Sequence, residues 1–430
     1  MNKKKKKAAL IATGAILGIA CATGVVMACR SGSVREIVPV RQESKEAKWT
    51  EAYEKIEKPY SEFVVDMTPI VFEEGGKNQC YSPLSLYYSL GVLAYGAEGE
   101  TEEELLNLLN VSDKETLAAQ YGEIYRMSLM IPYKPHEDAI PMGATMDIGT
   151  SLWLDNSLSY KKEYVHKLAE NFYTPAYQVN LGGAKAQKSM ENWLSEKTGG
   201  QIKLGNLGDV PDKGLMLLNT VTFADFWYDS FDPEDNTKEI FYTADGREIE
   251  CEFINQEDGI FGLFSLAEEE QYIAVTRRLG KSYVSFVLPE EGVNPADLLA
   301  DPETVRNMIY PDADSLRTVK ATWHMPKFTT ESAVDCNAVM EKAGVKHLTA
   351  GCPDLGGITD EPVSIDGMKQ VTRIGMDENG VTVASAAGIV TQGVAQYEWI
   401  DVNLNRPFIY IIYGRGGVVA IGVCDDPTAQ

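Results

Sequence analysis

Residues 376–408 read MDENGVTVASAAGIVTQGVAQYEWIDVNLNRPF, and this stretch indicates the fold more clearly than any other part of the chain. From Gly380 to Gln396 it contains no proline and no charged residue, only Val, Ala, Ser, Thr, Ile, Gly and Gln. Surface loops are usually punctuated by Pro, Asn and Asp. A long uncharged connection of small and β-branched residues can instead join a β-sheet. We therefore interpret the segment as one that a protease can cut and that can also become a strand.

Length and composition describe a globular chain with an acidic surface. The 430 residues are 44% hydrophobic and 9% aromatic. They exceed the roughly 250–300 residues at which a single core stops growing, so one large mixed domain or two smaller ones fit. The net charge of −24 argues against nucleic acid as a partner, because phosphate binding needs a basic face. No linker or repeat interrupts residues 49–430, which we expect to fold as one unit.

Residues 1–29 have the pattern of an export signal. Lys3–Lys7 is followed by Ala8–Ala28, 21 residues without a charge. Three outcomes remain open. First, Val26–Cys29 resembles the lipobox of bacterial lipoproteins, and cleavage before Cys29 would leave a lipidated cysteine. Second, an uncleaved helix would anchor the chain in a membrane. Third, cleavage near residues 20–22 would release the protein. The chain is thus expected outside the cytoplasm, secreted or attached to the membrane or cell surface, with residues 30–48 as a polar tether to a domain at 49–430.

The other cysteines indicate free thiols. They are odd in number after Cys29, widely scattered and without a CxxC pair, so a disulfide framework is not expected. We expect buried thiols at Cys80, Cys251, Cys336, Cys352 and Cys424.

Helix signals are concentrated in the first half of the chain. Ser82-Pro83 predicts a helix start, with Ser as N-cap and Pro in the first turn. Thr101–Glu104 has the form of a capping box. Lys161–Tyr173 and Ala184–Lys197 show helical spacing of apolar residues.

Strand signals are concentrated in the second half. Leu215–Phe226 is almost continuously apolar, which predicts a strand buried on both faces, and Ser282–Pro289 is similar. Phe408–Tyr413 and Val418–Val423 flank a Gly-rich turn and predict a β-hairpin. Helices followed by strands indicate an α+β fold.

The chain shows no plausible catalytic set. It has no HExxH helix and no GxSxG elbow, and its phosphate-loop-like and Gly-rich segments are incomplete. Structural or solvated roles account for all four histidines, at positions 136, 166, 324 and 347. We predict that the protein is not an enzyme and needs no metal or cofactor.

Taken in order, several blocks resemble the serpin family, and the resemblance extends from about residue 50 to the end. The blocks are Tyr81–Leu86; Asn192–Trp193 with Thr198, Gly200 and Ile202; Leu218–Thr220 with Phe223 and Trp227; Pro326–Phe328; Asp354–Ile358; Asp377–Gly380; Asn405–Phe408; and Gly422–Pro427. The chain is similar to a bacterial, exported member of that family.

The resemblance implies a serpin fold with three β-sheets, eight or nine helices and an exposed reactive-centre loop at about residues 380–398. It implies a metastable monomer and a serine protease as partner. The protease attacks the loop and forms an acyl-enzyme, and the cut loop then enters the central sheet as a new strand and traps it; such strand addition is a described mode of recognition and switching.

The resemblance also implies site residues. The loop hinge would comprise Glu378, Gly380, Val381, Thr382, Val383, Ala384, Ser385, Ala386 and Ala387. The region where the sheet opens would comprise Ser82, Ser85, Asn219, Trp227 and Gln370. Two departures matter: Val381 and Val383 are bulkier than usual for inhibitory members, and Gln370 stands where many members have His, although a Gln amide can make equivalent hydrogen bonds to Ser82 and Asn219.

Loop length in the family places the cut bond at Val394-Ala395, within one residue, so that Gly393 is also a candidate. A small aliphatic residue there suits the narrow pocket of an elastase-like serine protease. Alternatively these residues are inert filler. We predict a suicide-substrate inhibitor; the alternatives are a non-inhibitory serpin that acts as a binding or structural protein, and a membrane-attached hydrolase.

Overall fold

The computed structural model describes most of the chain between residues 34 and 429. The described residues are 34–40, 43, 45–48, 51–73, 78–132, 143–207, 210–211, 213–256, 264–269, 271–349, 351, 353–363, 365, 368–381 and 398–429. Residues 1–29, expected to be an export signal, as well as Cys352 and residues 382–397, lie outside them.

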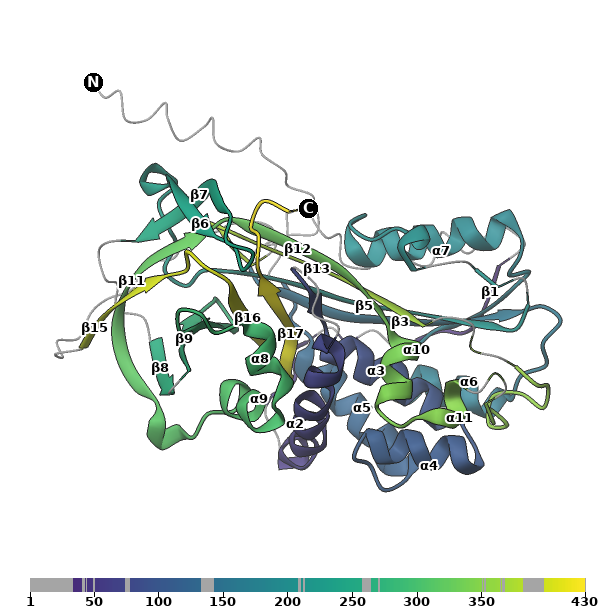
Figure 1. The fold of residues 1–430 in the computed structure, drawn as a ribbon. Coiled ribbons are helices and arrows are strands. Elements are labelled where there is room, and N and C mark those ends of the chain that lie inside the picture. Colours follow the sequence, from purple (N-terminus) through teal and green to yellow (C-terminus); the bar gives the residue numbers. More distant parts are fainter. Residues whose placement is uncertain are drawn as a thin grey trace.

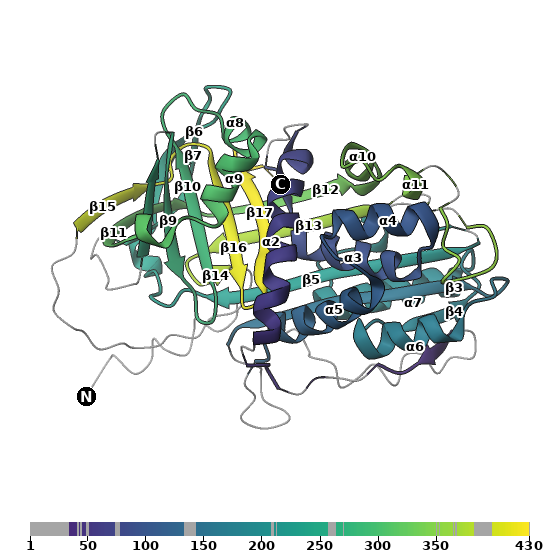
Figure 2. The same cartoon turned by 90° about the horizontal axis from the view of Figure 1, so that it is seen from below.

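A seven-stranded sheet forms the centre of the molecule (Figure 1). Helix α7 lies on its upper face, and α3, α4 and α5 cover the opposite face (Figure 2). Its strands, in order across the sheet, are β1 (Arg35–Val38), β4 (Ala176–Val179), β3 (Thr145–Asp155), β5 (Leu215–Phe226), β14 (Gly380–Val381), β13 (Lys369–Asp377) and β12 (Phe328–Asp335).

The remaining strands form one ten-stranded sheet, nine of them in a continuous path. The strands are β2 (Cys80–Tyr81), β17 (Gly417–Cys424), β16 (Phe408–Gly414), β10 (Tyr283–Pro289), β9 (Tyr272–Arg278), β8 (Phe264–Glu269), β11 (Arg317–Pro326), β7 (Glu248–Gln256) and β6 (Thr237–Tyr242), with β15 (Glu398–Asn403) parallel to β11. Strand β11 pairs with both β8 and β7. The second and third sheets that the family resemblance implies are therefore joined through β11.

The described residues form ten α-helices, slightly more than the eight or nine expected, because short helices such as α11 are included. They are α2 (Glu51–Phe72), α3 (Pro83–Gly96), α4 (Gly99–Leu108), α5 (Lys114–Ser128), α6 (Lys162–Asn171), α7 (Ala184–Thr198), α8 (Pro295–Ala300), α9 (Pro302–Ile309), α10 (Cys336–Lys342) and α11 (Lys346–Thr349). None of the helices in the described part has the length and apolar character needed to span a membrane.

Helix α3 begins where the sequence predicts. The Ser82 hydroxyl accepts a hydrogen bond from the backbone N–H of Ser85 at 3.2 Å, and Pro83 is the first helical residue. The helix is apolar on all sides and almost entirely buried beneath the seven-stranded sheet.

Helix α4 begins two residues before the predicted capping box. It starts at Gly99, and Glu98 at the N-cap position makes no side-chain capping bond. The Thr101 hydroxyl instead accepts a hydrogen bond from the backbone N–H of Asp354 at 3.1 Å. A distant tertiary contact therefore uses the group that the local pattern assigned to capping.

Strand β5 has the predicted bounds but not the predicted burial. Leu215 and Leu218 are buried, whereas Leu217 and Val221 are only half-buried. Helix α7 covers only part of the upper face of this sheet (Figure 1), so the strand is not enclosed on both sides along its whole length.

The segment expected as a tether contacts the folded domain. Strand β1 pairs with β4 at the edge of the seven-stranded sheet. Glu46 accepts a hydrogen bond from the backbone N–H of Ile131 at 2.9 Å and forms ion pairs with Lys281 and Arg415. The ordered unit therefore extends toward the N-terminus beyond the expected boundary at residue 49.

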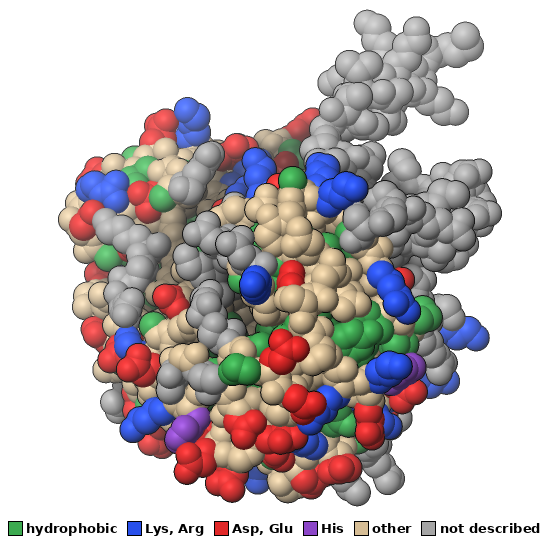
Figure 3. Space-filling model, turned by 90° about the vertical axis from the view of Figure 1, so that its right-hand side faces the viewer, with side chains coloured by type: hydrophobic (Ala, Val, Ile, Leu, Met, Phe, Trp, Pro, Cys, Tyr) green, Lys and Arg blue, Asp and Glu red, His purple; other side chains and the backbone are tan. Residues whose placement is uncertain are grey.

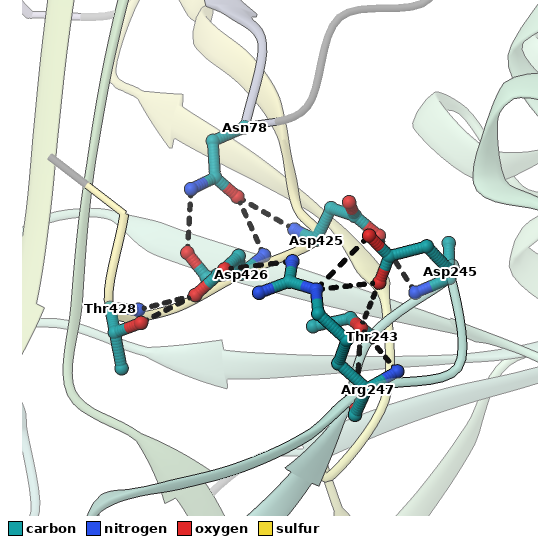
Figure 4. Close-up of polar contacts among 8 residues, drawn as sticks. Asn78, Thr243, Asp245, Arg247, Asp425, Asp426 and Thr428 are labelled. Carbon is teal, nitrogen blue, oxygen red and sulfur yellow. Dashed lines mark hydrogen bonds and ion pairs between the residues drawn. The ribbon is translucent and has the colours of Figure 1, made fainter.

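The C-terminal residues are fastened by a polar network (Figure 4). The Asn78 side-chain oxygen accepts hydrogen bonds from the backbone N–H groups of Asp425 and Asp426 at 2.8 and 2.9 Å. Arg247 forms ion pairs with Asp245 at 3.0 Å and with Asp426 at 3.2 Å. The network joins the end of the chain to the residues just before β2 and to the β6–β7 hairpin.

The four described cysteines, Cys80, Cys251, Cys336 and Cys424, are free and buried, as predicted.

Acidic side chains are spread over the face shown in Figure 3 and are densest toward its lower edge, in keeping with the net charge of −24.

Candidate functional site

The hinge of the loop already belongs to the seven-stranded sheet. The chain leaves β13, turns, and runs back as the two-residue strand β14 between β13 and β5. Val381 pairs with Met376 on β13 and with Asp225 on β5, and its side chain is 1% exposed. Two residues of the segment expected as the loop hinge thus form a short strand between β13 and β5.

Trp227 holds the turn between β13 and β14 from two sides. Its indole Nε1–H donates a hydrogen bond to the backbone carbonyl of Asp377 at 2.8 Å. Its backbone N–H donates to the carbonyl of Asn379 at 3.2 Å. Because Trp227 is fully buried, these bonds are protected from competition by water.

Ion pairs of Lys327, the residue between β11 and β12, fix the same turn. Lys327 Nζ lies 2.8 Å from a carboxylate oxygen of Glu378 and 2.7 Å from one of Glu252. Partial burial alone would lower the pKa of Lys327, but hydrogen bonds to the two carboxylates outweigh it and raise that pKa. Lys327 therefore stays cationic and bridges the hinge to β7.

Glycine is required at position 380 because the backbones of β14 and β5 come very close together there. Its φ of +152° lies in a region that glycine favours. A Cβ at this position would lie 2.2 Å from the Asp225 carbonyl oxygen and 2.7 Å from Phe226 Cα. Any other residue would displace β14 from β5.

Asp225, a buried carboxylate on β5, lies next to the hinge strand β14. It accepts hydrogen bonds from the Ser282 hydroxyl and from the Lys281 backbone N–H, the latter at 2.8 Å. Burial raises the pKa of Asp225, and these hydrogen bonds offset part of that effect. The carboxylate ties β5 to the turn that precedes β10, beside the position where Val381 is seated.

A cavity continues from the end of β14 between β5 and β13. Its volume is about 60 Å³, enough for about four water molecules. Because its lining comes from both faces of the sheet, the cavity passes between the two strands. The lining includes Ser82, Ser85, Val419 and Ala420 beneath the sheet, Thr198, Gly199, Gln201 and Ile202 above it, and Val221–Phe223 and Val371–Ile374 on the strands.

A hydrogen-bonded cluster closes the lower end of this gap. The Gln370 side chain accepts from the backbone N–H of Ser82 and donates to its carbonyl oxygen, both at 2.9 Å. Asn219 accepts a hydrogen bond from the Ser85 hydroxyl and donates to the Thr150 hydroxyl at 2.7 Å. Gln370 thus reaches Ser82 as expected, whereas the hydrogen bonds of Asn219 go to Ser85 and Thr150.

The structure places the described candidate residues along one line, from the turn after β13 to the first turn of α3. They are Glu378, Gly380, Val381, Trp227, Asn219, Gln370, Ser82 and Ser85. The other candidates lie outside the described residues: Cys29, Thr382, Val383, Ala384, Ser385, Ala386, Ala387, Gly393, Val394 and Ala395.

Sequence reasoning missed three residues that the structure places at or near the hinge. Asp225 is the one charge in the largely apolar strand β5, and a buried charge requires partners, so this interruption was a usable signal. Arg277 is followed directly by Arg278 in β9, and nothing in the sequence marked it as the buried one of the two. Lys327 lies in a block that resembled the family, but nothing in the sequence pointed to its pairing with Glu378.

Comparison with known proteins agrees with this geometry. The family model described as "Serpin (serine protease inhibitor)" matches residues 59–427, which is most of the chain. The chain belongs to the serpin family. As a serpin it belongs to a family of protease inhibitors and is not an enzyme.

Individual serpins are distant in sequence. The chain is 23% identical to alpha-1-antiproteinase S of the guinea pig Cavia porcellus over 384 residues, which cover 88% of this chain and 92% of the relative. It is 24% identical to iripin-2 of the tick Ixodes ricinus over 375 residues, which cover 85% and 91%.

Solved serpin structures show the same fold. The native state of the thermophilic serpin tengpin matches with a TM-score of 0.74 and 20% identity, covering 92% of this chain and all of that one. Human thyroxine-binding globulin, solved in complex with thyroxine, matches with a TM-score of 0.73 and 18% identity, covering 88% of this chain and all of that one. The likeness to these structures shows the fold alone.

Proposed function

We propose that this serpin is a suicide-substrate inhibitor of an elastase-like serine protease. The protease serine attacks the carbonyl carbon of the residue before the cut bond, the amine of the following residue leaves, and an acyl ester joins the two proteins. Insertion of the cut loop between β5 and β13 then removes the ester from the geometry needed for hydrolysis. The observation that carries the proposal is β14, which already occupies the first two positions of the inserting strand.

The register of β14 defines where the rest of the loop would go. Continuing from Val381, every second residue would face inward as Val381 does. Val383, Ser385 and Ala387 would then lie opposite Ile374, Thr372 and Gln370 on β13, in the direction of the cavity. Each inserted residue adds backbone hydrogen bonds worth about 0.5–1.5 kcal/mol net, so insertion of a full-length strand is strongly favourable.

The bulk of Val381 does not argue for a non-inhibitory serpin. The valine is seated with 1% exposure between its neighbours on β5 and β13, so the sheet accommodates a β-branched side chain at the first inward position. The alternative still has support from the fold, since thyroxine-binding globulin, which binds thyroxine by its name, has a similar structure. The two functions differ in whether cleavage of the loop traps the protease in a stable complex or only yields the cut chain.

The specificity proposal rests on loop residues Gly393, Val394 and Ala395. Small aliphatic side chains on either side of the cut bond fit a narrow pocket and lack the charge or ring that trypsin-like or chymotrypsin-like pockets select. Incubation with elastase should give a complex that resists SDS, together with a released C-terminal fragment. Sequencing that fragment should give Ala395 as its first residue, within one position. Complete cleavage without any complex would support the non-inhibitory alternative.

We further propose that the protein works outside the cytoplasm, attached through its N-terminus or released. The charged and apolar pattern of residues 1–29 supports export. Metabolic labelling with palmitate tests lipidation directly. Label in the wild type that is lost in C29S indicates a lipoprotein, whereas an unlabelled protein in the medium indicates cleavage and release.

A further inference from the structure

A fully buried arginine lies against the tryptophan that holds the hinge. Arg277, on β9, is 1% exposed. Its guanidinium carbon lies 4.0 Å from the ring centre of Phe231, 4.9 Å from that of Trp227 and 5.1 Å from that of Trp323. The cation is therefore enclosed by three aromatic rings.

Polar contacts fix the orientation of this guanidinium. Its Nη2 donates hydrogen bonds to the backbone carbonyl of Asp229 at 2.7 Å and to the Gln256 side chain at 2.9 Å. Burial lowers the pKa of Arg277 to about 9, so it remains charged at neutral pH. A buried charge is costly, and an apolar side chain would fill an aromatic cluster at lower cost.

One member of this cluster is the residue that holds the hinge. Trp227 contacts Arg277 through its ring face and the turn after β13 through its Nε1–H. Phe231 packs edge-on against the same indole, with ring centres 5.6 Å apart. Phe286 also packs on the indole, with ring centres 6.4 Å apart. The plane of the indole, and hence the direction of its N–H, is constrained by Arg277 together with these two rings.

We propose that Arg277 is a positioning residue for loop insertion, acting through Trp227. The guanidinium holds the indole so that its N–H meets the Asp377 carbonyl, and the turn then presents Gly380 and Val381 as a preformed start for the inserting strand. Because insertion competes with hydrolysis of the acyl ester, a preformed start favours trapping over turnover. The assignment rests on the proposed insertion mechanism.

Three variants separate this role from a purely structural one. R277M keeps an unbranched side chain without the charge. R277K keeps a cation but not the planar group, and should give an intermediate effect. R278M is the matched control, because Arg278 is the next residue on β9 and also lies over an aromatic ring, that of Tyr228 at 4.0 Å.

The first measurement needs no protease target. The loop of each variant is cut with a zinc metalloprotease, which forms no acyl-enzyme, and the rate at which the cut protein gains heat resistance is followed. We expect R277M to gain it about fivefold more slowly than the wild type, with R278M unchanged. The second measurement is the number of inhibitor molecules consumed per elastase molecule, which should rise in R277M and remain at the wild-type value in R278M.

The outcomes are distinguishable. If the wild type gains heat resistance and R277M gains it at the same rate, the role of Arg277 is refuted and the proposed function stands. A lower melting temperature of uncut R277M with an unchanged insertion rate would show a structural role only. If the cut wild type gains no heat resistance, the insertion mechanism fails and the assignment of Arg277 fails with it.

Discussion

The indole N–H of Trp227 donates a hydrogen bond to the backbone carbonyl of Asp377 at 2.8 Å, so a buried side chain just after β5 holds the last residue of β13. W227F removes this bond and part of a fully buried ring, at a cost of at least about 1 kcal/mol. We expect the uncut protein to melt about 2 °C lower and more inhibitor to be consumed per protease. W399F is the control, since Trp399 is 56% exposed; equal effects of the two changes would show that the bond has no special role.

The ion pair between Lys327 and Glu378 should contribute measurable coupling. Both side chains are mostly shielded, with 25% and 19% exposure, so a double-mutant cycle of K327Q and E378Q should give about 1 kcal/mol in the free energy of unfolding of the uncut protein. The pair Lys238–Glu250, exposed at 76% and 61%, serves as the comparison and should give a value near zero. If the effects of K327Q and E378Q on the free energy of unfolding add strictly, the two residues do not stabilise each other and the prediction is wrong.

Charge on the inward face of the inserting strand should abolish trapping. By the register of β14, Ala387 would lie inward between Asn219 and Gln370, whereas Ala384 would face outward. Burying a glutamate at position 387 costs several kcal/mol, so we expect A387E to be cleaved as a substrate and A384E to retain more inhibition. The measurement is the fraction of cleavage events that yield an SDS-resistant complex. Equal fractions for the two variants would refute the register.

Stability of the uncut protein should depend on pH through His347. Its Nδ1 lies 2.7 Å from Glu104 and its Nε2 lies 2.8 Å from Glu100, which joins α11 to α4. The hydrogen bond to Glu104 raises the pKa of His347 above its ordinary value of 6.5, against smaller opposing effects of desolvation and of Lys346. Because the folded state binds this proton more tightly, the stabilisation is complete below pH 6.5 and is lost as the pH rises through the folded-state pKa.

The test compares melting temperatures of the wild type and H347Q from about pH 5.5 to about pH 8.5. The wild type should lose more stability than H347Q across this range, and H166Q, altered at a surface histidine of α6, should follow the wild type. Parallel curves for the wild type and H347Q would contradict the prediction.

Local signals in the sequence predicted those features of the fold that depend on neighbouring residues. Ser82 and Pro83 predicted the start of α3, because a capping side chain and its N–H partner are three residues apart. Thr101 was misread as a cap because its hydroxyl serves Asp354, far along the chain. The hinge candidates Glu378, Gly380 and Val381 came from resemblance to the family and not from a physical pattern.

Long-range pairing could not be predicted. The seating of Val381 depends on Asp225, which lies on β5 in a different part of the chain, and no spacing rule connects them. The cage around Arg277 likewise combines Trp227 and Phe231, from the segment just after β5, with Trp323 on β11. What the sequence did offer was a single charge, Asp225, in a largely apolar strand, which marks a position whose partners must be sought in three dimensions.

We propose that the uncut protein is metastable and that the freed loop completes the seven-stranded sheet. Calorimetry of the protein before and after a single cut between residues 393 and 396 tests it most directly. We predict that the cut protein melts far above the uncut one, because insertion adds a full strand of hydrogen bonds between β5 and β13. Equal melting temperatures for the two forms would show that the uncut protein is not metastable and that the cut loop does not insert.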